Sequence, residues 1–134
     1  MNDKFFVDSN VFLYLLDVNE SKKKLIVLTL VEEIPFISSQ VVFECLNVCL
    51  KKKKVEQAKA LKFVRKLVAA SFIQPETDIT ISTALLLYEK YSLQPYDSKI
   101  IASALLAGCN ILYSEDMQHG LVVENKLTII NPFL

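Results

Sequence analysis

Phe5-Phe6-Val7-Asp8-Ser9-Asn10-Val11, near the start of the chain, is a short apolar run that ends abruptly at an acidic residue. Three consecutive apolar residues bounded by polar ones are typical of a short strand that is buried on both faces. Such strands occur in parallel sheets covered by helices, and their carboxyl ends carry the polar residues that face a ligand. This stretch therefore predicts both a central strand and a functional residue, Asp8.

Similar short apolar runs recur along the chain, and helical patterns separate them. Strands are expected at 5–7, 36–37, 72–73, 111–113 and 128–130. Helices are expected at 10–16, 22–33, 38–52, 55–70, 78–91 and 97–107, with Gly108 as the C-terminal cap of the last one. Alternation of strands and helices predicts an α/β fold, namely a three-layer α/β/α sandwich with a central parallel sheet. We expect one domain over residues 1–134.

Composition excludes several classes of protein. Hydrophobic residues make up 52% of the 134 residues and charged residues 22%, which is typical of a folded chain with a substantial core. Residues 1–8 do not have the pattern of a signal peptide, and no apolar run approaches the roughly 20 residues needed to span a bilayer. We therefore expect a cytoplasmic protein without a membrane anchor. The three cysteines have no disulfide framework and are expected to be reduced.

A formal net charge of zero conceals an uneven distribution. Residues 51–66 hold eight basic residues against Glu56 alone, a local charge of +7, and the rest of the chain carries −7. The basic residues are Lys51, Lys52, Lys53, Lys54, Lys59, Lys62, Arg65 and Lys66. Basic segments attract phosphate backbones, although a solvated helix face with a lysine-rich turn is the commoner explanation.

Four acidic residues are expected to meet at one edge of the sheet. Asp8 ends the first strand, and Asp116 follows the strand at 111–113. Glu44 lies early in the helix after the strand at 36–37, in an otherwise apolar segment, and Asp97 lies in the first turn of its helix. Because helices that follow parallel strands begin at the carboxyl edge of the sheet, all four carboxylates can converge there.

Converging carboxylates without basic residues among them favour a divalent cation. Burial and mutual repulsion raise the pKa of such groups unless a cation neutralises them. Oxygen ligands suit Mg²⁺ or Mn²⁺, and either ion can activate water and neutralise charge on a phosphoryl group. Taken singly, each acid has an ordinary explanation as a turn, capping or ion-paired residue. It is the ordered set of four that indicates a metal site.

The blocks that carry these acids resemble those of PIN domains. Phe5–Val11 is similar to the opening block of that family, and Glu44 to its second acid. Residues 96–104 are similar to the third block, and 112–116 to the fourth. The resemblance implies a metal-dependent ribonuclease like the toxins of bacterial VapBC toxin–antitoxin pairs, with RNA as substrate, a homodimer and a cognate antitoxin. It also implies metal-centred roles for Asp8, Glu44, Asp97 and Asp116.

The resemblance assigns supporting roles as well. Asn10 and Ser114 are expected to be polar groups around the metal centre. The segment 114–120 departs from the commonest toxin pattern, so that Glu115 is an alternative to Asp116 as the fourth acid.

Other site types have fewer matching residues. His119 is the only histidine and stands in a Gln-His-Gly context typical of a surface or capping residue. Gly108 and Gly120 are the only glycines, so no glycine-rich phosphate loop can form. Two alternatives to a nuclease stay open: a PIN-like module that binds RNA or protein without cleavage, and a phosphohydrolase that acts on small phosphoesters.

Overall fold

The structure, a computed structural model, describes residues 3–19 and 21–134. Met1 and Asn2, which begin the segment considered above as a signal peptide, lie outside the described residues. The strands are β1 (Phe5–Val7), β2 (Phe36–Ile37), β3 (Phe72–Ile73), β4 (Ile111–Tyr113), β5 (Val122–Val123) and β6 (Leu127–Ile130). The helices are α1 (Ser9–Phe12), a 3₁₀ turn (Leu13–Leu16), α2 (Lys22–Glu32), α3 (Ser39–Lys51), α4 (Gln57–Ala69), α5 (Asp78–Tyr91) and α6 (Pro95–Leu106).

The six strands form one sheet in the order β3-β2-β1-β4-β6-β5. All neighbours are parallel except β5 and β6, which form an antiparallel pair at one edge. β1 lies between β2 and β4, with Phe6 opposite Phe36 on one side and Leu112 on the other. The expected parallel sheet is thus confirmed for its central strands, and its last edge makes the whole sheet mixed.

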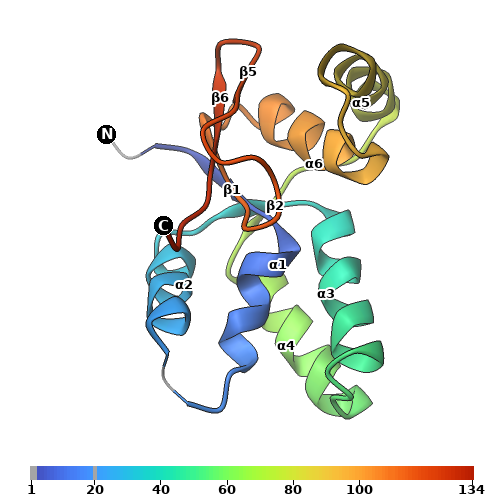
Figure 1. Cartoon of the computed structure of the whole chain (residues 1–134). Coiled ribbons are helices and arrows are strands. Elements are labelled where there is room, and N and C mark those ends of the chain that lie inside the picture. Colours follow the sequence, from blue (N-terminus) through green and yellow to red (C-terminus); the bar gives the residue numbers. More distant parts are fainter. Residues whose placement is uncertain (1–2, 20) are drawn as a thin grey trace.

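Helices flank this sheet, so the predicted α/β fold is confirmed. In Figure 1, α1 continues directly from β1 with α2, α3 and α4 around it, whereas α5 and α6 lie together elsewhere. The core between these elements is apolar and fully closed to solvent at its centre. Its largest wholly buried side chains include Phe6, Phe12, Ile101, Leu112 and Ile129. None of the described helices is long and apolar enough to cross a membrane.

Local sequence signals account for the helix ends. Thr77 accepts a hydrogen bond from the backbone of Ile79, and Thr80 accepts one from the backbone of Thr77, which forms a capping box at the start of α5. Pro95 is the first residue of α6, where its lack of an N–H costs nothing. Gly108 follows the end of α6 with a φ of +79°, the left-handed conformation that favours glycine.

The structure differs from the sequence-based expectation in two places. β5 was not expected, because Val122-Val123 is too short to show a periodic pattern and depends on pairing with β6. The expected single helix at 10–16 is split into α1 and a 3₁₀ turn. All three cysteines are buried and unpaired, as expected.

Leu112→Ala tests the central position of β4. Leu112 is fully buried, so the substitution should lower the free energy of unfolding by about 2–5 kcal/mol, as expected when a core leucine is truncated. Leu134→Ala is the matched control, because Leu134 is 85% exposed and its truncation should change stability by less than about 0.5 kcal/mol. Urea denaturation measures both, and equal effects would contradict this placement of the core.

Candidate metal-binding edge

The chain reverses direction across the sheet between β1 and β4. From β1 it builds β2 and β3 on one side, and it then crosses to β4 on the other. Ligand sites in open α/β sheets lie outside the carboxyl ends of the strands at this kind of switch point. Asp8 directly follows β1, and its backbone N–H donates to the carbonyl of Tyr113, the last residue of β4, at 2.9 Å. The two acidic segments therefore leave the sheet side by side.

Asn10 connects these two segments. Its side-chain amide nitrogen lies 3.1 Å from Asp8 Oδ2 and 3.3 Å from Asp116 Oδ2, so it can donate to both carboxylates. Its Oδ1 accepts from the backbone N–H of Glu115 at 3.0 Å, which fixes the orientation of the amide. Ser114, fully buried, donates from Oγ to Asp8 Oδ2 at 2.9 Å. Asn10 and Ser114 thus surround Asp8 with neutral donors.

Glu44 and Asp97 come from the helices α3 and α6. Ser9 Oγ donates to Glu44 Oε1 at 3.1 Å, which joins α3 to the residue after Asp8. The amide of Gln40, one turn before Glu44, donates to Glu44 Oε2 at 3.3 Å and to the backbone carbonyl of Tyr96 at 3.2 Å. Gln40 therefore holds Glu44 next to the residue that precedes Asp97.

Burial and neighbouring negative charges raise the pKa values of Asp8 and Asp97. Burial of Asp8, whose exposed fraction is 5%, raises its pKa to about 6; hydrogen bonds from Ser114 and Ser9 oppose this, and the charges of Glu44 and Asp97 add to it. The pKa of Asp97 is also raised, first by burial and then by Glu44 and Asp116. Every charge named in these shifts is negative, so the four acids form one field that lacks a compensating cation among its described neighbours.

Glu115 is turned away from this field. Its carboxylate accepts from the Tyr14 hydroxyl at 2.6 Å and pairs with Lys23 Nζ at 2.8 Å. These two partners lower the pKa of Glu115 against the effect of its burial. Phe133 packs edge-on against the Tyr14 ring at 5.0 Å. The geometry leaves Asp116, and not Glu115, on the side of Asp8.

The donor set matches a hard divalent cation in charge and in chemistry. It consists of carboxylate oxygens with neutral amide and hydroxyl groups behind them, the kind of ligands that Mg²⁺ and Mn²⁺ prefer. Within residues 3–19 and 21–134, no three acidic, histidine or cysteine side chains already stand in a metal-holding arrangement.

The sequence analysis missed several residues that contact the acids of this edge. Gln40 stands four residues before Glu44 and so shares its helix face, a spacing that gives a usable signal. Tyr14 and Lys23 lie 101 and 92 residues from Glu115, and only the folded chain brings them together. His119 accepts a hydrogen bond from the backbone N–H of Asn131 at 2.9 Å, in agreement with its interpretation as an exposed capping residue.

Comparison with known proteins agrees with this geometry. The family model for the PIN domain matches residues 5–122, so the chain belongs to the PIN domain family. PIN domains are generally nucleases that use divalent metal ions. No curated protein matches the sequence.

Solved structures share the fold at low identity. A toxin–antitoxin complex from Klebsiella pneumoniae has a TM-score of 0.69 at 17% identity and covers 96% of this chain and 97% of that chain. FitAcB from Neisseria gonorrhoeae has a TM-score of 0.63 at 16% identity, covering 96% and 98%. FitAB bound to a DNA fragment has a TM-score of 0.63 at 17% identity, covering 97% and 96%.

Asp8 should make the stability of the metal-free protein depend on pH. Its pKa is raised from 3.8 to about 6 in the folded state, so the native state favours the protonated form. The free energy of unfolding should therefore fall as pH rises from about 4 to about 6, by up to about 3 kcal/mol. Urea denaturation in EDTA at several pH values measures this dependence.

The matched controls are Asp8→Asn and Glu89→Gln. Asp8→Asn should abolish this part of the pH dependence, whereas Glu89→Gln, at an exposed position of α5, should retain it. An unchanged pH profile in Asp8→Asn would show that another group is responsible.

Proposed function

We propose that this chain is a metal-dependent endoribonuclease that hydrolyses phosphodiester bonds in RNA. The observation that carries the proposal is the acidic edge at the switch point, where Asp8, Glu44, Asp97 and Asp116 share one negative field. Membership of a family of nucleases supports it. A field of this kind repels RNA unless a cation is bound, so the arrangement favours a bound cation over a purely structural role.

In this proposal the four acids hold Mg²⁺ or Mn²⁺. The ion, when bound, supplies an activated water and neutralises charge on the phosphoryl group. The chain's own residues contribute positioning: Asn10 sets the separation of the Asp8 and Asp116 carboxylates, and Ser114 directs one oxygen of Asp8. Gln40 and Ser9 fix both oxygens of Glu44. These neutral donors orient the carboxylates and leave their negative charge available to the ion.

We further propose that the chain is the toxin of a toxin–antitoxin pair and works as a homodimer. A solved structure with the same fold is described as a toxin–antitoxin complex, which supports a cognate antitoxin as partner. An exposed apolar surface on α5 supports a second copy. It contains Ile81, Leu85, Leu86 and Tyr88, which are between 46% and 69% exposed. Patches of this kind on a folded domain mark protein interfaces.

The alternative is a PIN-like module that binds RNA or protein without cleavage. Binding of RNA without metal-dependent turnover would select that alternative. Activity on a generic phosphoester without any cleavage of RNA would instead select a small-molecule phosphohydrolase.

The lead proposal predicts RNA cleavage that requires a divalent ion. Purified protein should cleave single-stranded or structured RNA with Mn²⁺ and should lose this activity in EDTA. Asp97→Asn should lower kcat at least about 100-fold, because the ion provides several kcal/mol of charge stabilisation. Glu89→Gln on α5 is the control and should retain activity. Cleavage that survives EDTA, or that persists in Asp97→Asn, would contradict the proposal.

Substitutions of Asp116 and of Glu115, the two candidates for the fourth acid, should differ in their effect on metal affinity. Asp116→Asn should weaken Mn²⁺ binding at least about tenfold, measured by isothermal titration calorimetry. Glu115→Gln should leave Mn²⁺ affinity within about threefold and lower the free energy of unfolding slightly, because it loses the pair with Lys23. The reverse order of metal affinities would assign the fourth position to Glu115.

A further inference from the structure

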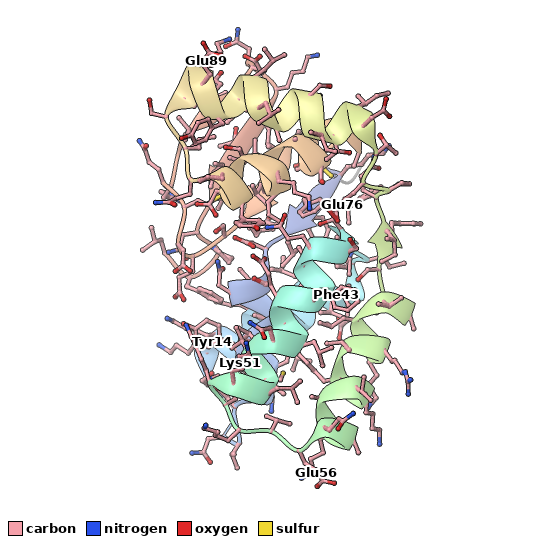
Figure 2. All side chains as sticks on the ribbon, turned by 90° about the vertical axis from the view of Figure 1, so that its right-hand side faces the viewer. Tyr14, Phe43, Lys51, Glu56, Glu76 and Glu89 are labelled. Atoms are coloured by element: carbon pink, nitrogen blue, oxygen red, sulfur yellow. The ribbon has the colours of Figure 1, made fainter. Side chains whose placement is uncertain are left out.

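An open groove of about 610 Å³ extends along α3 from its first turn to its last. One face of α3 forms its floor, and the start of α6 forms part of its wall. The lining residues are Ser39, Gln40, Phe43, Glu44, Leu46, Asn47, Leu50, Tyr96 and Lys99. Figure 2 shows Glu76, Phe43 and Lys51 in this order from the start of α3 to its end.

The two ends of the groove differ in charge. Glu44, Asn47 and Lys51 are spaced three and four residues apart, so they lie on one face of α3. Glu44 belongs to the acidic edge, and Lys51 lies about 10 Å further along the helix axis at 1.5 Å per residue. One helix face therefore connects the proposed metal site to the first lysine of the basic segment.

All eight basic residues of 51–66 are exposed. Among the described residues, the salt bridges involve Lys23, Lys90 and Lys99 and none of the basic segment. On α4 the basic side chains stand opposite the face that packs into the core. That buried face consists of Ala60, Val64 and Leu67. The positive charge of the segment is thus not neutralised within the described part of the chain.

Two exposed aromatic rings stand at the acidic end of the groove, Phe43 directly before Glu44 and Tyr96 directly before Asp97. Phe43 is 65% exposed and Tyr96 is 69% exposed, and both line the groove. An exposed aromatic ring is a stacking platform for any unpaired nucleobase. Lys99, which lines the groove, is paired with Glu76 at 2.8 Å, so the attraction for phosphates comes from the far end.

We propose that this groove binds a single-stranded segment of the RNA substrate. The backbone of the segment runs from the acidic edge along α3 to Lys51–Lys54, and an unpaired base stacks on Phe43. The proposal rests on the proposed function, because it supplies the substrate class of the same site. An acidic protein segment would complement the lysines alone. The exposed rings and the continuity with the acidic edge favour a polyanion that also carries planar bases.

The basic segment also offsets the repulsion between the acidic edge and the phosphates of RNA. The chain outside 51–66 carries −7, which repels phosphates from the place where cleavage is proposed. The basic segment 51–66 carries +7 and begins directly after Leu50, the last α3 residue of the lining, and its attraction acts over roughly a Debye length of about 10 Å at 0.1 M salt. The strip is therefore expected to set the affinity for RNA without contacting the metal.

A binding titration as a function of salt tests the lysines. Fluorescence anisotropy of a labelled 12-nucleotide RNA without secondary structure gives Kd, with every variant placed in an Asp97→Asn background to prevent cleavage. Lys52→Gln/Lys53→Gln should reduce the slope of log K against log salt by about 1.4 and weaken binding about tenfold at low salt. Lys22→Gln/Lys126→Gln makes the same change of net charge at exposed positions outside the strip and should leave the slope unchanged.

Phe43 gives a second, independent readout. Phe43→Ala should raise Kd about 5- to 100-fold at every salt concentration without changing the slope, because stacking is not electrostatic. Leu25→Ala, at an exposed apolar position on α2 outside the groove lining, should leave Kd unchanged.

Three outcomes would overturn the proposal. The first is equal behaviour of the two lysine pairs. The second is an unchanged Kd in Phe43→Ala. The third is loss of binding to a poly-glutamate peptide in Lys52→Gln/Lys53→Gln while RNA binding stays intact, which would assign the strip to an acidic protein partner. Because these titrations measure binding alone, RNA binding with the predicted slopes but no cleavage by the wild-type chain would contradict the nuclease and not the groove.

Discussion

Burial of the Asp8 carboxylate at the end of β1 is the constraint on which the rest of the candidate site depends. A carboxylate that is 5% exposed must have its oxygens hydrogen-bonded, and here the donors are the backbone of Ser9 and the side chains of Asn10 and Ser114. All are uncharged. A basic partner would satisfy Asp8 more strongly, but it would also cancel the negative charge that attracts a cation.

The presence of a lysine partner distinguishes two other acids nearby from the acids of the edge. Glu115 and Glu76 both lie close to the site, and each is paired with a lysine, Lys23 and Lys99. Glu76 also accepts from the backbone N–H of Gln40 at 3.0 Å, at the start of the helix that carries Glu44. The paired acids thus hold neighbouring elements in place, whereas the acids of the edge remain available to a ligand.

The sequence predicted most of the architecture because its signals are local. Short apolar runs locate the central strands, and Gly108 and Pro95 mark the ends of α6. Asp8, Glu44, Asp97 and Asp116 are predicted as a set because each follows a strand or lies early in a helix at one edge of a parallel sheet. The orientation of Glu115 was not predictable, because it depends on Tyr14 and Lys23, which are distant in sequence. β5 was missed for a related reason, since two residues acquire strand structure only through their partner.

The position of β4 in the sheet has a consequence for synthesis of the protein on the ribosome. β1 ends at Val7, but its neighbour β4 comes much later in the sequence, and Ser114 lies 106 residues after Asp8. Since chains emerge from the N-terminus, Asp8 and Asn10 lack these partners until Ser114 and Asp116 have been made. The acidic edge is therefore incomplete in a nascent chain until residues 114–116 have been made, and under the proposed function such a chain has no cleaving activity before that point.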